Sequence, residues 1–171
     1  TFVEQQRKTS KGPYRFQRET VHPTDSQPMS GYGFPVKPVG LICSAFRPSD
    51  DSTVYPFLIP SNFFAVTSLK QAAEMVTTLH SDKVLADKLT ALAKEVDTAL
   101  KNYAIKDHPE FGKMFAFEVD GFGSAYLMDD SNVPSLMSMP YLGAINADDP
   151  IYKNTRKFIL SENNPFFFKG T

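Results

Sequence analysis

The fold is decided by residues 61–103, which read SNFFAVTSLKQAAEMVTTLHSDKVLADKLTALAKEVDTALKNY. From Asn62 onward, apolar residues recur three and four positions apart, the spacing of a helix that buries one face. These residues are Ala65, Leu69, Ala72, Ala73, Val76 and Leu79. Pro60 and Ser61 supply a helix start signal directly before them. The pattern predicts a helix of about five turns.

A second amphipathic helix follows almost at once. Ser81 or Asp82 can cap its first turn. Its apolar positions again fall on one face: Leu85, Leu89, Leu92, Val96, Ala99 or Leu100, and Tyr103. Two helices joined by so short a link are expected to lie antiparallel, as an αα-hairpin.

The sequence outside this hairpin predicts less regular structure. Residues 114–119 alternate in polarity, which predicts a strand. Asp120 and Gly121 supply a turn, and residues 125–128 would form the second strand of a β-hairpin. Residues 132–142 are interpreted as a short helix that ends before Gly143. A further helix over 151–160 starts at Asp148, Asp149 and Pro150, with the acids as its cap. Residues 10–60 are rich in Pro, Gly and aromatic residues and predict an ordered loop.

Bulk composition excludes several classes of function. The chain has 18 Lys and Arg against 19 Asp and Glu, with a formal charge of −1, so it lacks the basic footprint of a nucleic-acid-binding protein. No apolar run is long enough to span a bilayer. The 3 histidines have no Cys or His partner at ligand spacing, which argues against a zinc site. The single cysteine and the lack of a glycosylation sequon lean toward an intracellular protein, but localisation stays open because the chain starts at Thr1 without a methionine.

Carboxylates gather in short loops next to patterned apolar segments, which is how active sites are often built. The first such loop is Arg47-Pro48-Ser49-Asp50-Asp51. The second is the turn that carries Glu118 and Asp120, and the third contains Asp129, Asp130 and Asn132. The third loop fails as a calcium site because it lacks the required glycine and the bidentate glutamate.

Six stretches together carry a resemblance to a known family: residues 44–51, 59–66, 118–123, 128–136, 140–143 and 154–156. In this order, they closely resemble glycoside hydrolase family 125, and the match extends over essentially the whole chain. That family comprises inverting, metal-independent exo-α-1,6-mannosidases built on an (α/α)6 barrel. The resemblance implies a mainly α fold, no cofactor, no metal ion and a mannose-containing glycan as substrate.

The resemblance also implies that this chain is one part of a larger barrel. The family's domain is considerably longer, and the match starts part-way into it. Residues 1–171 are therefore expected to form a single domain that is the central segment of an incomplete (α/α)6 barrel, with long loops and a small β-hairpin. The rest of the barrel would come from another segment or chain, or self-association would cover the exposed surface.

Inverting hydrolysis needs one carboxyl group as acid and one carboxylate as base, about 6.5–9.5 Å apart. By position along the family's domain, the acid falls on Asp50 or Asp51, and the sequence does not decide between them. Adjacent carboxylates oppose each other's ionisation, which suits a proton donor, whereas Arg47 opposes this for the acid that it pairs with. The family's base is a glutamate expected beyond Thr171.

The remaining candidates have two interpretations each. Arg47, Ser49, Glu118, Asp120, Asp129, Asp130 and Asn132 are candidate contacts to the sugar. Asn132 is equally a natural helix cap, and Asp120 before Gly121 is equally simple turn chemistry. Arg15 and Arg18 can pair with the acids of the site or form structural salt bridges elsewhere.

An α-mannosidase is the function that the sequence favours for the full-length protein, with the isolated fragment expected to be inactive. The alternative from another class is a non-catalytic mannoside-binding or scaffold protein on the same barrel. A third hypothesis is an α-glycosidase of different linkage specificity.

Overall fold

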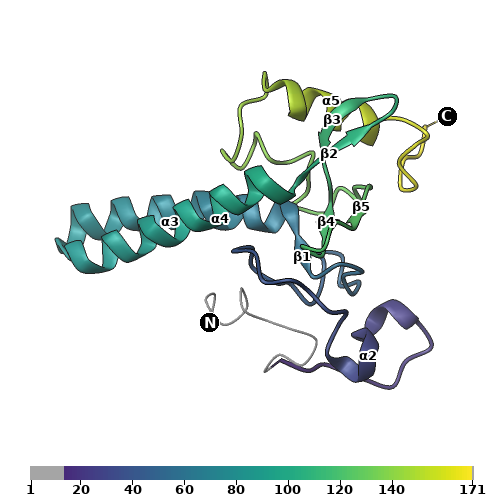
Figure 1. Cartoon of the computed structure of the whole chain (residues 1–171), viewed down its shortest axis with the longest axis horizontal. Coiled ribbons are helices and arrows are strands. Elements are labelled where there is room, and N and C mark those ends of the chain that lie inside the picture. Colours follow the sequence, from purple (N-terminus) through teal and green to yellow (C-terminus); the bar gives the residue numbers. More distant parts are fainter. Residues whose placement is uncertain (1–13, 171) are drawn as a thin grey trace.

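The computed structural model describes residues 14–170. A long helical hairpin forms an arm that extends from the rest of the molecule (Figure 1). It consists of α3 (Ile59–His80) and α4 (Lys83–Tyr103), which pack along each other and confirm the predicted αα-hairpin. Ser81 ends α3 in the left-handed region with a φ of 53°, and the Asp82 carboxylate caps α4 by accepting from Leu85 N–H at 3.0 Å.

Two small antiparallel sheets lie at the base of this arm. The first has the order β1-β4-β5, formed by β1 (Phe57–Leu58), β4 (Glu118–Val119) and β5 (Ala125–Tyr126). In its register, Leu58 lies opposite Glu118, and Glu118 lies opposite Tyr126. The pairing of β4 with β5 confirms the predicted β-hairpin. The second sheet pairs β2 (Ile105–His108) with β3 (Gly112–Phe115), a hairpin that the sequence did not predict.

The predicted strand over residues 114–119 is divided between the two sheets. β3 ends at Phe115, after which Ala116 N–H donates to Ala104 O at 2.8 Å. The next amide, Phe117 N–H, donates to Tyr126 O at 2.9 Å. The backbone therefore changes partners at this point, and residues 114–119 are all buried on both sides of the change.

The third long helix, α5 (Pro150–Ile159), begins where the sequence predicts. The Asp149 carboxylate accepts from Ile151 N–H at 2.8 Å and from Tyr152 N–H at 2.9 Å. Asp148 does not cap this helix: it forms an exposed ion pair with Lys153 at 2.7 Å, which lowers the pKa of Asp148. Only the second of the two acids has the predicted role.

The short helix predicted over residues 132–142 is wrong: this segment is a succession of turns. In a helix, the amides of Leu136 and Met137 would donate to the carbonyls four residues earlier. Here both amides donate to the Asp129 carboxylate instead. Asn132 is exposed and caps no helix.

The segment before the arm is irregular but ordered by its own hydrogen bonds. Residues 14–56 contain the 3-10 turn η1 (Pro23–Asp25) and α2 (Pro28–Gly31), a single turn in which Met29 and Ser30 have φ values of 54° and 58°. This agrees with the predicted loop over residues 14–56, whereas residues 57–60, which the prediction also included, belong to β1 and to the start of α3. Residues 10–13 lie outside the described range.

The core lies where the base of the arm meets the three-stranded sheet. Its fully buried side chains come from all the elements around this junction: Leu41, Phe57, Leu58, Ile59, Val96, Leu100, Met114, Phe117, Met128, Leu136 and Met139. Gly121 follows β4 with a φ of 80°, and a Cβ there would lie 2.5 Å from Lys37 O, so only glycine fits this turn. Across residues 14–170, we find no helix with the length and hydropathy needed to cross a membrane.

Candidate active site

The loop Arg47–Asp51 forms a closed turn that carries two adjacent acids. An antiparallel bridge between Phe46 and Ser52 closes it, and Arg47 N–H donates to Asp51 O at 2.8 Å. Asp50 N–H donates back to Arg47 O at 3.0 Å, and Asp50 has a φ of 67°. A residue other than glycine in this left-handed region carries backbone strain, which tends to occur at functional sites.

Asp50 and Asp51 differ in their surroundings. Asp51 is half-buried, and its Oδ2 accepts from Ser49 Oγ at 3.0 Å. Asp50 is exposed, and its carboxylate has no hydrogen-bond partner among residues 14–170. The two adjacent acids are therefore not equivalent, because one oxygen of Asp51 is bound to Ser49 whereas neither oxygen of Asp50 accepts a hydrogen bond from a described residue.

Behind this loop, Arg47 forms a buried ion pair with Glu118 of β4. Arg47 Nε donates to Glu118 Oε1 at 2.6 Å, and the two side chains are 6% and 0% exposed. Glu118 Oε2 accepts from the amides of Val54 and Tyr55, both at 3.0 Å. Both Glu118 oxygens are thus occupied by protein donors, so the predicted direct contact of Glu118 with sugar has no free acceptor atom in this arrangement.

The Arg47 guanidinium is fixed in place by its neighbours. It lies 5.6 Å from the ring centroids of both Phe117 and Tyr126. Burial alone lowers the pKa of Arg47, but the hydrogen bond and charge of Glu118 outweigh this, and the net pKa is raised. Arg47 is therefore a permanent cation at a fixed position.

Two buried polar atoms near this cation have no hydrogen-bond partner among the described residues: Arg47 Nη2 and Asp130 Oδ2. Asp130 is close enough to Arg47 for its charge to contribute to the raised pKa of Arg47. Buried polar atoms normally have partners, so each exception calls for an explanation. An unpartnered donor on Arg47 and an unpartnered acceptor on Asp130 suit a ligand that offers both hydroxyl hydrogens and oxygens.

Asp129, next to Asp130, has a different role. It is fully buried, and its carboxylate accepts from Leu136 N–H at 3.4 Å and from Met137 N–H at 3.0 Å. Asn164 holds its backbone through two hydrogen bonds, of 3.2 Å from Asp129 N–H and 3.0 Å to Asp129 O. Burial raises the pKa of Asp129 to about 6, against the opposing effect of the Met137 amide. Its atoms fix the loop that carries Asp130, and they are directed at protein, not at solvent.

Asp120 and Asn132 are engaged in local turns. Asp120 Oδ1 accepts from three successive amides, those of Phe122, Gly123 and Ser124, at 2.8, 3.1 and 3.0 Å. This is the turn chemistry that the sequence offered as one of two interpretations. Asn132 donates its N–H to Asp130 Oδ1 at 3.1 Å and its side-chain amide to Asp130 O at 3.3 Å, so it orients Asp130.

The predicted residues thus divide into two neighbouring groups. Ser49, Asp50 and Asp51 share the loop that begins at Arg47, and the Arg47 side chain pairs with Glu118 and experiences the charge of Asp130. Sequence reasoning missed Asn164, which has no motif and is 35 residues from the backbone that it holds. It also missed a pocket of about 280 Å³ beside Asp50, lined by Tyr14, Phe16, Arg18 and Phe46.

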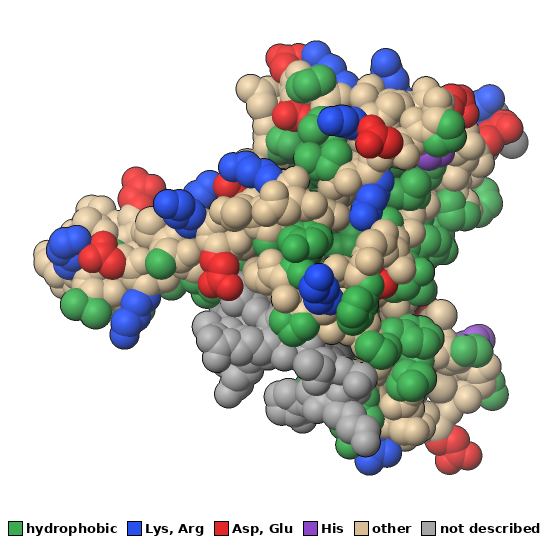
Figure 2. Space-filling view, in the orientation of Figure 1, with side chains coloured by type: hydrophobic (Ala, Val, Ile, Leu, Met, Phe, Trp, Pro, Cys, Tyr) green, Lys and Arg blue, Asp and Glu red, His purple; other side chains and the backbone are tan. Residues whose placement is uncertain are grey.

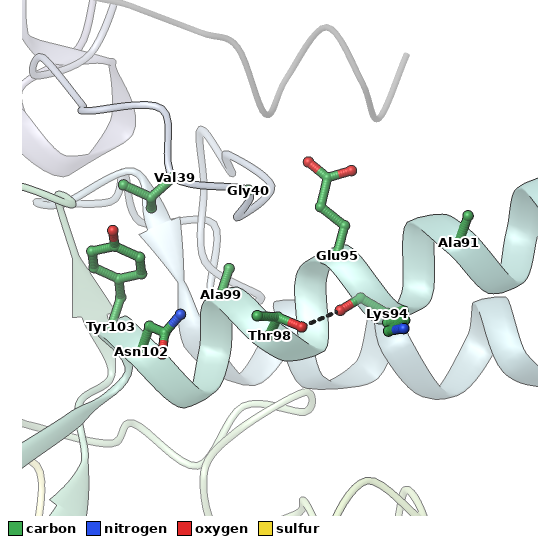
Figure 3. A pocket seen from close by; sticks show the side chains of 9 residues that line it. All are labelled: Val39, Gly40, Ala91, Lys94, Glu95, Thr98, Ala99, Asn102 and Tyr103. Atoms are coloured by element: carbon green, nitrogen blue, oxygen red, sulfur yellow. Dashed lines mark hydrogen bonds between the residues drawn. The ribbon is translucent and has the colours of Figure 1, made fainter.

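Another hollow lies away from these residues. It is an open groove of about 570 Å³ along the outer face of α4, next to Val39 and Gly40 (Figure 3). Among its lining residues, Thr98 Oγ1 donates to Lys94 O at 2.8 Å, a bond within the helix itself. None of the predicted site residues lines this groove, so size alone does not identify the active site. Residues 14–170 also contain no cluster of three or more His, Cys, Asp or Glu side chains that could hold a metal ion.

Comparison with known proteins shows which family this chain resembles. The family model described as metal-independent alpha-mannosidase (GH125) matches residues 1–171. The meiotically up-regulated gene 157 protein of Schizosaccharomyces pombe is 46% identical over 160 residues, which cover 92% of this chain and 31% of that protein. A solved metal-independent alpha mannosidase from Streptococcus pneumoniae, in a non-productive complex with alpha-1,6-mannobiose, matches with a TM-score of 0.94 and 41% identity.

The match to the bacterial structure covers 99% of this chain and 40% of that one. The chain therefore spans less than half the length of either of these relatives. The fold is that part of a GH125 domain, rich in helix with a few short strands. On these matches, the chain belongs to glycoside hydrolase family 125, the metal-independent α-mannosidases.

Proposed function

We propose that the full-length protein is an inverting exo-α-1,6-mannosidase that releases terminal mannose from a glycan. The observation that carries this proposal is the 41% identical structure, which matches nearly the whole chain and was solved with alpha-1,6-mannobiose bound. We further propose that α3 and α4 form one helical hairpin of an (α/α)6 barrel and that residues 1–171 form one domain with the rest of it.

In this proposal, Asp50 is the general acid. Its free carboxyl group donates a proton to the glycosidic oxygen while the bond from that oxygen to C1 of mannose breaks. A water molecule attacks C1 from the opposite face and gives its proton to a carboxylate base, which yields β-mannose and the shortened glycan. Asp51, held by Ser49, orients the loop and does not transfer the proton.

The base is expected outside these residues, as the resemblance implies. Glu118 is a poor substitute because Arg47 and two backbone amides occupy both of its oxygens. A base must accept a proton from water, and a carboxylate that already accepts three hydrogen bonds in a buried site is ill suited to this.

The mannose that is released would contact the two buried polar atoms without protein partners, one on Arg47 and one on Asp130. Arg47 Nη2 can donate to one hydroxyl group and Asp130 Oδ2 can accept from another. Three other residues would then act indirectly. Glu118 holds Arg47, and Asn132 orients Asp130. Asp129 holds the loop that carries Asp130. We assign no cofactor and no metal ion to this chemistry.

The proposal can be tested by supplying α-1,2-, α-1,3- and α-1,6-linked mannobiose side by side to the full-length protein. We expect turnover of the α-1,6-linked disaccharide, with β-mannose as the first anomer seen by proton NMR. Early α-mannose would contradict inversion, and preference for another linkage would contradict the specificity. Binding of the disaccharide without any turnover would support the non-catalytic alternative.

A further inference from the structure

We propose that Asn164 is a positioning residue for Asp130 and, through Asp130, sets how strongly the site holds mannose. This inference rests on the proposed function, in which Asp130 Oδ2 accepts from a hydroxyl group of the mannose. It adds to that function a residue from the segment after α5, outside the three acidic loops of the sequence. The role is indirect, because Asn164 acts on the backbone that carries Asp130.

The side chain of Asn164 is bound entirely to backbone atoms, and it is 3% exposed. Its Oδ1 accepts from Asp129 N–H at 3.2 Å and from Phe166 N–H at 3.4 Å. Its Nδ2 donates to Asp129 O at 3.0 Å and to Ile159 O at 3.1 Å. An asparagine side chain offers two N–H donors and one oxygen with two lone pairs. All of them are used here, so the role of Asn164 is to hold the chain and not to contact a ligand.

Asn164 controls the orientation of Asp130 through the peptide bond that joins Asp129 to Asp130. The oxygen of this peptide bond is Asp129 O, which accepts from Asn164 Nδ2. Because a peptide unit is planar, restraining its oxygen also restrains the amide nitrogen and the Cα of the next residue. The N–H of Asp129 is held by Asn164 Oδ1. One side chain therefore brackets the backbone from which the Asp130 carboxylate projects.

The far end of the same loop is fixed to α5 as well. The Asp129 carboxylate accepts from Met137 N–H at 3.0 Å, which closes residues 129–137 into a ring. Tyr152 of α5 donates its hydroxyl hydrogen to Met137 O at 3.1 Å. Tyr152 and Asn164 thus hold this ring at its two ends, and both belong to α5 or to the segment that follows it.

This anchoring explains how a buried acceptor is kept open. Asp130 Oδ2 is buried and has no partner among residues 14–170, a cost in folding free energy that a mobile side chain would avoid by turning toward a donor. Asn132 N–H holds the other oxygen, Asp130 Oδ1, at 3.1 Å. With the backbone also held, a mannose hydroxyl group meets an acceptor that is already in place, and binding does not have to order it.

The test is a double-mutant cycle on the full-length protein, with kcat/KM for α-1,6-mannobiose per mole of folded protein as the measurement. We expect Asn164→Ala to lower kcat/KM by about tenfold, because the substrate must then order Asp130 as it binds. In an Asp130→Ala background, the same change should cost less than about twofold, since Asn164 has no carboxylate left to position. An equal loss in both backgrounds is the result of a merely structural role and would overturn the inference.

Asn62→Ala is the matched control, because Asn62 is 1% exposed and brackets a distant residue in the same way. Asn62 Oδ1 accepts from Ile42 N–H at 2.8 Å, and its Nδ2 donates to Ile42 O at 3.0 Å and to Leu58 O at 2.8 Å. Asn62 does not hold residues 129–137, so its effect on kcat/KM should be the same with and without the Asp130 carboxylate. Equal coupling of both asparagines to Asp130 would reveal general loosening and would also overturn the inference.

Tyr152→Phe keeps the test decisive where Asn164→Ala fails to fold, because it removes only the hydroxyl group that holds Met137 O. We expect a loss of about threefold in kcat/KM, which again disappears in the Asp130→Ala background. Turnover by the unmodified protein without coupling in the variants would sink the inference alone. An unmodified protein that does not hydrolyse α-1,6-mannobiose would sink the proposed function, and the inference with it.

Discussion

Nε of Arg47 lies 2.6 Å from Oε1 of Glu118, although the two residues are 71 positions apart in the sequence. This buried pair fixes the base of the loop that carries Asp50 and Asp51 to strand β4. Glu118 extends the link to the far side of the loop through the amides of Val54 and Tyr55. The position of the proposed acid therefore depends on a contact between distant segments.

Replacing Glu118 tests the strength of this link. We expect Glu118→Gln to lower the free energy of unfolding by about 3–5 kcal/mol, because it leaves the Arg47 charge buried without a counterion. Asp97→Asn removes one partner of the surface pair with Lys101 and should cost at most about 1 kcal/mol. Urea unfolding of both variants gives the comparison. If the two variants lost the same free energy of unfolding, breaking the buried Arg47–Glu118 pair would cost no more than breaking a surface pair.

The two adjacent acids should respond differently to the same change. Asp50→Asn should reduce kcat on α-1,6-mannobiose by about 10²- to 10⁴-fold, because general acid catalysis is worth about that much. The loss should be smaller on α-mannosyl fluoride, whose leaving group needs less protonation. Asp51→Asn keeps an oxygen to accept from Ser49 Oγ and should lose less activity. The reverse order of the two variants on mannobiose would transfer the role of acid to Asp51.

Local signals in the sequence were enough to predict the helical hairpin and the start of α5. Apolar spacing, a capping aspartate and a proline after Asp149 are all features of neighbouring residues. The failed helix over 132–142 shows the limit of such signals. There the amides of Leu136 and Met137 donate to Asp129 and not to the backbone, and no local pattern reveals this competition.

In the candidate site too, features set by neighbouring residues could be predicted, and features set by distant contacts could not. The Asp50–Asp51 pair was visible as a run of acids after a turn, but the structure was needed to show that Ser49 binds the carboxylate of Asp51 and not that of Asp50. The roles of Glu118 and Asn164 depend on partners 71 and 35 residues away. Contacts at such separations are set by packing of the whole domain, so single-sequence reasoning had no means to find them.

The N-terminal cap of α5 offers a matched pair of variants. Asp149→Ala should lower the free energy of unfolding by about 1 kcal/mol, because two amides of the first turn lose their acceptor. Asp148→Ala removes only an exposed ion pair and should be close to neutral. Thermal unfolding measures both variants. A larger loss for Asp148→Ala would contradict the assignment of the cap.

Asp129 should make stability depend on pH in a specific direction. Burial raises its pKa from 3.8 to about 6, so the folded protein binds more protons than the unfolded chain between these values. The stability contributed by protonated Asp129 is complete below pH 4 and is lost as the pH rises through about 6. The free energy of unfolding of the unmodified protein, relative to Asp129→Asn, should fall by up to about 3 kcal/mol between pH 4 and 7. A difference that does not change with pH would contradict the raised pKa.

The surface of the helical arm bears on how the 171 residues behave alone. Apolar side chains are exposed along α3 and α4, including Phe64, Met75, Leu79, Val84 and Leu85, and some lie at the end of the arm (Figure 2). Between the two helices runs an apolar groove of about 440 Å³. In the relatives, most of the chain lies outside the matched part, so further segments are available there to cover such a face.

We therefore expect the isolated 171-residue chain to associate and to lack hydrolytic activity. Association follows because exposed apolar surface of this kind favours contact between copies, and inactivity follows because the proposed acid would have no base across from it. Sedimentation velocity and an α-1,6-mannobiose assay measure the two properties. The double variant Leu79→Gln and Val84→Gln should associate less, since it makes the end of the arm polar. A monomer that hydrolyses the disaccharide would mean that the base lies within these residues, and a search for it would then begin with Glu118.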